Sequence, residues 1–159
     1  MSIEDKRQLL SLLEEKERRL NEFKLEDPRM KDKWWRMNNL YYIINENAEK
    51  ILFQPKLRDV QTALHEDPHN RKLILKARQH GVTTYYCIDF LDNAMFNNNV
   101  RCGIIAHNKD DAQIFFADKV KYAFDNLRCP ELKEKMAATK DSSRELVLQT
   151  TQLFVLELH

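Results

Sequence analysis

A glycine, hydroxyl side chains and basic side chains stand together near the middle of the chain, in an arrangement suited to binding phosphate. Gly81 lies between an apolar run, Leu73-Ile74-Leu75, and a stretch from Tyr85 to Phe96 that is apolar nearly all round. Glycine at a strand-to-helix turn lets backbone N–H groups approach an anion at the helix N-terminus. Thr83 stands where a phosphate-bound Mg²⁺ expects a hydroxyl ligand. The pattern therefore predicts a strand, a tight phosphate-binding loop and a buried helix.

The loop departs from the regular phosphate-loop pattern, Gly-x-x-x-x-Gly-Lys-Ser/Thr. Lys76 takes the place of the first glycine and Val82 that of the lysine, whereas Gly81 and Thr83 match. Lys76 and Arg78 lie where they can reach the phosphate oxygens that Val82 cannot, so the positive charge would come from the other end of the loop. The alternative is a plain strand-to-helix turn with an ordinary solvated basic pair.

The segments after this loop predict a βαβα arrangement with a parallel sheet. A second apolar run, Cys102-Gly103-Ile104-Ile105-Ala106, follows the buried helix. Asn108 is a suitable cap for the next helix, with Asp110 and Asp111 in its first turn, and Arg128-Cys129-Pro130 stops that helix. The same helix carries a buried stripe at helical spacing: Ala112, Phe116, Val120, Ala123 and Leu127.

The residues before the loop predict a charged helix, a hairpin and a further helix. We expect residues 1–30 to form an N-terminal charged helix, either solvated on the domain or acting as a partner-binding arm, and residues 31–159 to form one domain. Residues 40–44 and 51–53 flank a polar turn and predict a hairpin. Pro55 then opens a helix that ends near His65.

Composition excludes several classes of protein. The 26 basic and 25 acidic residues give a net charge of +1, so any contact with nucleic acid would be local. No window approaches the ~18 consecutive apolar residues of a membrane span, and the N-terminus lacks the apolar core of a secretory signal. Cys87, Cys102 and Cys129 are far apart and show no Cys-x-x-Cys spacing. These features predict a cytoplasmic protein without a zinc site or a disulfide framework.

The segment Lys76-Ala77-Arg78-Gln79-x-Gly81-x-Thr83-Thr84 resembles the deviant Walker A motif of phage terminase large subunits. In that family the basic residue stands at the start of the loop and the standard lysine is often replaced. Gln61 before the loop, and Ile104-Ile105-Ala106-His107 followed by Asp110-Asp111-Ala112 after it, also resemble the family in order and spacing. The resemblance runs from about Asn38 to Val155.

This resemblance implies an α/β, three-layer P-loop NTPase fold with a mainly parallel sheet, truncated at its C-terminal side. It implies that ATP and Mg²⁺ bind at the loop, with Thr83 on the metal and Gln61 reading adenine. The nucleotide contacts would come from Lys76, Ala77, Arg78, Gln79, Gly81, Val82, Thr83 and Thr84. The intact parent would hydrolyse ATP to package double-stranded DNA into a procapsid, with a portal and a small terminase subunit as partners, in the cytoplasm of an infected or lysogenic bacterium.

The chain departs from a working ATPase at its C-terminal side. No apolar run ends in Asp-Glu, and residues 145–148 and 153–158 read as a hairpin in which Glu157 lies inside a strand pattern. The acidic Walker B residues and the nuclease domain of the family are absent, so we expect no turnover by this chain alone. An apolar strand edge there predicts self-association.

Two other functions remain open from the residues. One is a catalytically inactive, P-loop-like interaction module, which Val82 and the missing acids favour. The other is a helicase-type DNA-dependent ATPase fragment, although such a protein would normally keep lysine at position 82.

Overall fold

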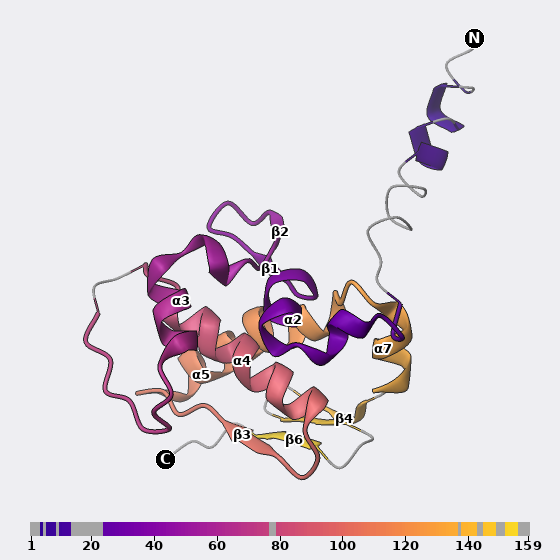
Figure 1. The fold of residues 1–159 in the computed structure, drawn as a ribbon. Helices are drawn as coiled ribbons and strands as arrows, with labels where there is room; N and C mark the ends of the chain where they lie inside the picture. The colour runs from indigo at the N-terminus through magenta and orange to yellow at the C-terminus, as the bar shows by residue number, and fades with distance from the viewer. Residues whose placement is uncertain are drawn as a thin grey trace.

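The computed structural model describes residues 4, 6–8, 10–13, 24–76, 79–136, 138–142, 145–148 and 152–155. Helices and sheet are mixed, with α-helices lying over the sheet formed by the C-terminal strands (Figure 1). The helical segments are η1 (Pro28–Lys31), α2 (Lys33–Asn39), η2 (Pro55–Leu57), α3 (Asp59–Glu66), α4 (Val82–Phe96), α5 (Lys109–Phe115), η3 (Phe116–Lys121), α6 (Tyr122–Asp125) and α7 (Pro130–Lys135). The strands are β1 (Tyr42–Ile44), β2 (Lys50–Leu52), β3 (Arg101–Gly103), β4 (Ala138–Asp141), β5 (Glu145–Leu148) and β6 (Gln152–Val155).

Both predicted hairpins are confirmed for the described residues; residues 156–158 of the second hairpin lie outside them. β1 and β2 pair antiparallel, with Ile43 opposite Ile51, and β5 pairs antiparallel with β6. The larger sheet has the order β3-β6-β5-β4, in which β3 and β6 are parallel and the other neighbours are antiparallel. The described sheet is therefore mixed, not mainly parallel as expected, because hairpin connections join neighbouring strands in opposite directions.

The prediction of a buried strand at Leu73–Leu75 is wrong. These residues form no strand, and Leu73 and Leu75 are both 102% exposed. An apolar run becomes a strand only when another strand satisfies its N–H and C=O groups. The parallel partner of β3 is β6 instead, so the expected βαβ unit around α4 is not formed.

The helical predictions around α4 and α5 are confirmed. α4 buries residues on several sides, among them Tyr85, Ile88, Leu91 and Met95. The Asn108 side chain caps α5 by accepting a hydrogen bond from the N–H of Asp111 at 2.8 Å. The expected stripe is buried along the run α5–η3–α6 and just beyond it: Ala112, Phe116, Val120, Ala123 and Leu127.

Two parts of the N-terminal half bear on the expected organisation. Residues 4, 6–8 and 10–13 are helical, and Leu10, Leu12 and Leu13 are exposed there. The helix expected to open at Pro55 is divided into η2 and α3 at Arg58. Among the described residues, no helix combines the length and the apolar character needed to cross a membrane.

Candidate functional site

A pocket of about 1000 Å³ lies between the β1–β2 hairpin, α3, the residues before α4 and the helix that contains η3. We call it the α3–α4 pocket. Its apolar wall comes from the hairpin and η2, and includes Ile43, Ile51, Phe53 and Leu57. Its polar end is formed by Arg58, Gln61, Gln79, Gly81, Thr84 and Lys119. A concave site with an apolar wall and a few converging polar groups is typical of small-molecule binding.

Gln61 is the most informative residue of this pocket. Its side chain is only 2% exposed, although a polar residue on a short helix is expected at the surface. The Nε2 atom donates a hydrogen bond to the Gly81 carbonyl at 3.1 Å, whereas no donor among the described residues pairs with the buried Oε1 atom. A buried acceptor without a donor costs about 1–3 kcal/mol, so a ligand donor that reached this oxygen would offset that cost.

Gly81 is required at its position for two reasons. Its φ is +67°, in the left-handed region that disfavours side chains. A Cβ atom there would also lie 2.5 Å from Gln61 Nε2. The predicted glycine at a tight turn before a buried helix is therefore confirmed, and its lack of a side chain makes room for Gln61.

The N-terminus of α4 opens beside this contact. The N-cap residue of α4 is Gly81, which has no side chain to cap the helix, and the first intrahelical bond closes from Tyr85 N–H to the Gly81 carbonyl at 2.9 Å. The N–H groups of the preceding helical residues have no acceptor inside the helix, and the helix dipole adds partial positive charge at the same end. An anion placed there gains hydrogen bonds and favourable electrostatics together.

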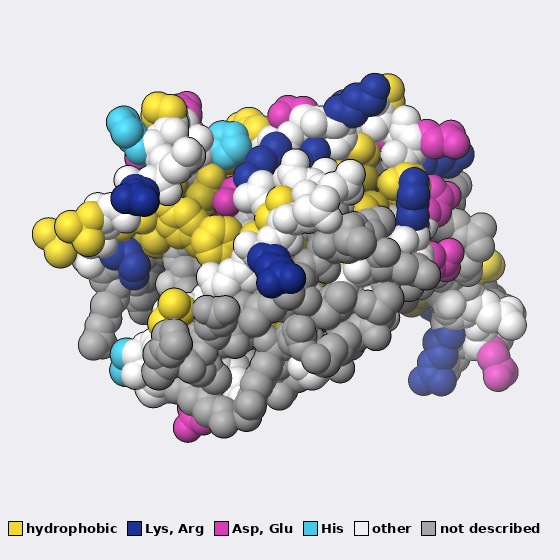
Figure 2. Space-filling model, turned by 90° about the horizontal axis from the view of Figure 1, so that it is seen from below, with side chains coloured by type: hydrophobic (Ala, Val, Ile, Leu, Met, Phe, Trp, Pro, Cys, Tyr) yellow, Lys and Arg dark blue, Asp and Glu magenta, His cyan; other side chains and the backbone are white. Residues whose placement is uncertain are grey.

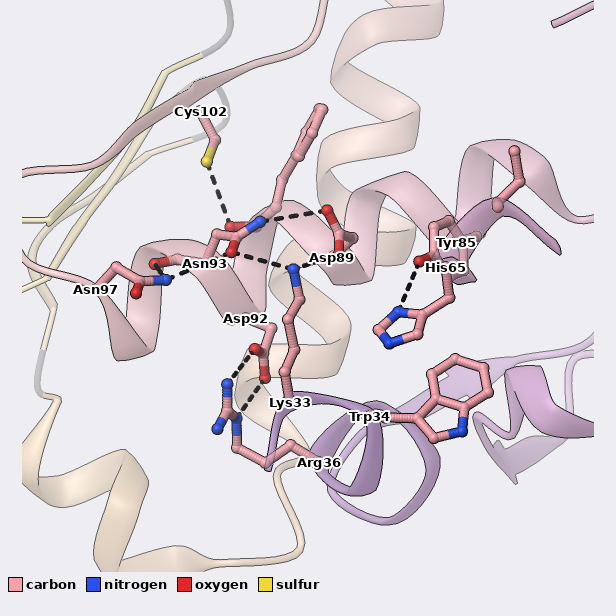
Figure 3. A network of polar contacts seen from close by, with 12 residues as sticks. Lys33, Trp34, Arg36, His65, Tyr85, Asp89, Asp92, Asn93, Asn97 and Cys102 are labelled. Carbon is pink, nitrogen blue, oxygen red and sulfur yellow. Dashed lines mark hydrogen bonds and ion pairs between the residues drawn. The ribbon is translucent and has the colours of Figure 1, made fainter. Parts of the chain in front are cut away.

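A polar network fixes α4 against α2 (Figure 3). Arg36 donates to both carboxylate oxygens of Asp92, at 2.9 and 2.7 Å, and the Tyr41 hydroxyl donates to the same carboxylate at 2.7 Å. Arg36 is 5% and Asp92 0% exposed, so the pair lies inside the core. Burial, together with the Asp92 carboxylate, raises the pKa of Tyr41 well above its ordinary value and keeps its hydroxyl a donor.

A second contact fixes α3 against α4 one turn away from the pocket. His65 lies four residues after Gln61, and Tyr85 four residues after Gly81, so both residue pairs join the same two helices. His65 Nδ1 lies 3.2 Å from the Tyr85 hydroxyl, and the imidazole stacks on Trp34 with ring centroids 4.1 Å apart. Burial and the nearby Lys33 ammonium lower the pKa of His65, which keeps the ring neutral. This contact holds Gln61 in register with Gly81.

The structure brings some predicted site residues together and places others elsewhere. Gln61, Gln79, Gly81 and Thr84 line the α3–α4 pocket. Lys76 is exposed and does not line that pocket, while Ala77 and Arg78 lie outside the described residues. Val82 is buried at 6% exposure.

Thr83 lies apart from these residues. It lines a separate groove of about 520 Å³ with Ile74, Tyr86, Cys87 and Ile105. Burial raises the pKa of the Cys87 thiol there to about 12, which keeps it protonated. The assignment of Thr83 to Mg²⁺ stays a prediction.

Sequence reasoning missed two basic side chains of the pocket, Arg58 and Lys119. Arg58 carries a weak signal, since it stands three residues before Gln61 and three-residue spacing places side chains on one helix face. Lys119 carries none, because it follows Thr84 by 35 residues and reaches it only in the fold.

The described residues contain no group of three or more His, Cys, Asp or Glu side chains that could hold a metal ion. A nucleotide-bound Mg²⁺ needs few protein ligands, because phosphate oxygens and water supply most of its coordination. No protein-family model matches the chain, and no curated protein matches it either.

Proposed function

We propose that the α3–α4 pocket binds ATP, and that the chain is the ATP-binding part of a viral DNA-packaging ATPase of the terminase large-subunit type. The observation that carries the nucleotide site is the buried Gln61 amide at the N-terminus of α4: its Nε2 donates to the Gly81 carbonyl, and its Oε1 has no donor among the described residues. This arrangement places a hydrogen-bond acceptor for a base beside a helix N-terminus that favours phosphates.

At the base end, Gln61 Oε1 accepts a hydrogen bond from the exocyclic amino group of adenine. Guanine carries a carbonyl oxygen at the corresponding ring position, so two acceptors would face each other and guanine is disfavoured. The apolar wall that includes Ile43 and Phe53 supplies contact surface for the flat base.

At the phosphate end, the N–H groups in the first turn of α4 donate hydrogen bonds to phosphate oxygens. Thr84 lines this end of the pocket, beside Gly81. The nucleotide enters as its Mg²⁺ complex, with phosphates and water as the main metal ligands. Thr83, the hydroxyl that the resemblance assigns to the metal, lines a separate groove, so in this proposal it makes no contact with the Mg²⁺ of a nucleotide in the α3–α4 pocket.

The wider function rests on the resemblance of the Lys76–Thr84 loop to terminase large subunits. In this proposal the parent protein has a three-layer P-loop fold and hydrolyses ATP to move double-stranded DNA into a procapsid, with a portal and a small terminase subunit as partners. It acts in the cytoplasm of the bacterial host. The chain by itself binds nucleotide without turnover, because the acidic groups that position Mg²⁺ and the attacking water are not among its recognised motifs.

The nucleotide site is tested by thermal unfolding with Mg-ATP and, separately, Mg-GTP, for the native chain and for Gln61→Met. A ligand present at 100 times its Kd stabilises the native state by about 2.7 kcal/mol. We expect ATP to raise the unfolding midpoint and GTP to raise it less, with the ATP effect lost in Gln61→Met. Gln113→Met, on α5 and outside the pocket lining, is the matched control and keeps the effect. An unchanged midpoint in saturating ATP, or equal effects of ATP and GTP, would contradict the proposal.

One observation favours a second candidate, a non-catalytic interaction module. Leu73, Leu75 and Ile105 are exposed at 102%, 102% and 66%, and apolar side chains gather on the face seen in Figure 2. Exposed apolar patches mark protein contacts more often than isolated exposed residues do. Sedimentation over a range of concentrations tests this reading, which predicts self-association that Leu73→Ser with Leu75→Ser weakens.

A further inference from the structure

Lys119 occupies an unusual position for a lysine. It is half-buried in η3, it lines the α3–α4 pocket, and its Nζ atom donates to Thr84 Oγ1 at 3.0 Å. Among the described residues, no carboxylate forms an ion pair with Lys119. Its ammonium therefore faces the pocket with a neutral hydroxyl as its hydrogen-bond partner.

This environment is unfavourable for the protein alone and favourable with an anion present. Partial burial removes part of the water around a charged group, and a single hydroxyl does not fully replace the lost solvation. A lysine ammonium has three N–H donors, and the bond to Thr84 uses one of them. The remaining donors are available to phosphate oxygens, which form charge-assisted hydrogen bonds about twice as strong as neutral ones.

The geometry points to Lys119 as the cation that a regular phosphate loop carries at the position held by Val82, and we propose that it binds the phosphates of a nucleoside di- or triphosphate. This inference rests on the proposed nucleotide site. Val82 is buried at the start of α4, and Lys119 reaches the same helical turn through Thr84, two residues later. Lys76, the cation expected from the loop, is exposed and outside the pocket lining.

Core packing of the neighbouring residues in η3 fixes the position of Lys119. η3 is a π-helical turn between α5 and α6, and Phe116 and Val120 within it are both 0% exposed. These two side chains anchor the turn in the core on either side of Lys119. A π-helical turn is a costly local irregularity that recurs at functional sites, and here it lies where the helix passes the pocket.

The test compares calorimetric binding of Mg-ATP and of adenosine by the full chain and its Lys119→Met variant. We expect Lys119→Met to weaken ATP binding about 10- to 100-fold, the effect of losing a charged hydrogen bond, and to leave adenosine binding unchanged. Lys119→Arg keeps the charge and restores part of the ATP affinity. Lys119→Gln serves as a second neutral variant, and the unfolding midpoint without ligand shows whether each protein is folded.

The controls separate this inference from the proposed function. Lys121→Met removes the same charge two residues along η3, outside the pocket lining, and is expected to retain ATP affinity. If the native chain binds ATP and the folded Lys119 variants bind it equally well, the inference is wrong while the nucleotide site stands. Loss of ATP affinity in Lys76→Met with none in Lys119→Met would likewise overturn it. If the native chain binds neither ATP nor adenosine, the proposed function fails and this inference fails with it.

Discussion

Replacing Gln61 with methionine is expected to make the protein more stable and at the same time unable to bind ATP. Methionine is unbranched and similar in length to glutamine, so it fills the same space without a polar end. The change removes the buried Oε1, which has no donor in the part of the chain that the structure describes, and also removes the 3.1 Å bond from Nε2 to the Gly81 carbonyl. That carbonyl still accepts the Tyr85 N–H at 2.9 Å, so no new unpartnered group is created.

The expected change in the free energy of unfolding follows from the removed oxygen and the lost hydrogen bond. Removing the unpartnered oxygen recovers about 1–3 kcal/mol, and losing the hydrogen bond costs about 0.5–1.5 kcal/mol. The balance is a gain of about 1 kcal/mol, which raises the unfolding midpoint by about 2–4 °C in a protein of this size. Functional sites commonly carry such a cost, and removing a ligand-binding polar group then stabilises the free protein.

The assay is urea unfolding in parallel with thermal unfolding, each with and without Mg-ATP. Gln113→Met controls for the change of residue type and is expected to alter the free energy of unfolding by less than about 0.5 kcal/mol. A Gln61→Met protein that is less stable than the native chain, and that still gains stability from ATP, would refute the reasoning. Gln61 would then be a structural residue whose amide holds α3 to α4.

Three further changes test the positions of α3 and α4. Gly81→Ala is expected to lower the free energy of unfolding by about 1–2 kcal/mol, because alanine disfavours the left-handed backbone; urea unfolding measures this. The same change is expected to abolish ATP binding by displacing Gln61, which calorimetry measures. Asp92→Ala leaves the buried Arg36 without its carboxylate partner and is expected to cost about 3–5 kcal/mol in urea unfolding. The folded protein lowers the pKa of His65, so the unfolded chain binds a proton near pH 6.5 that the folded protein does not. The stability that His65 contributes is therefore complete above that pH and falls as the pH drops below it. His65→Gln is expected to remove this part of the acid loss, which unfolding measured across pH detects.

One matched control, for Asp92→Ala, and an outcome that would contradict each change test these expectations. Asp89→Ala removes a carboxylate from the same helix, but its partner Lys33 is 34% exposed, so the expected cost is below about 1 kcal/mol. Equal costs for Asp89→Ala and Asp92→Ala would contradict the role given to burial. A Gly81→Ala protein with native stability would contradict the backbone argument, and an acid dependence that His65→Gln leaves unchanged would place the proton uptake on other groups.

Several elements were predictable because the signals that specify them are local. The apolar stripe from Ala112 to Leu127 predicts its helix, since side chains recur on one face every three or four residues. Gly81 predicts the turn before α4, and the polar turn between residues 44 and 50 predicts the first hairpin. In each case neighbouring residues contain the necessary information.

The sequence by itself determined these helices, turns and hairpins, and it drew attention to the loop before α4. Only the tertiary structure decided which distant segments meet: that β3 pairs with β6 rather than with Leu73–Leu75, and that Lys119 reaches Thr84. It also decided that Gln61 is buried, with an oxygen that no described residue pairs with. The physical reason is that periodicity and turn chemistry act over a few residues, whereas strand pairing, burial and the convergence of charges depend on contacts between segments that are far apart in the chain.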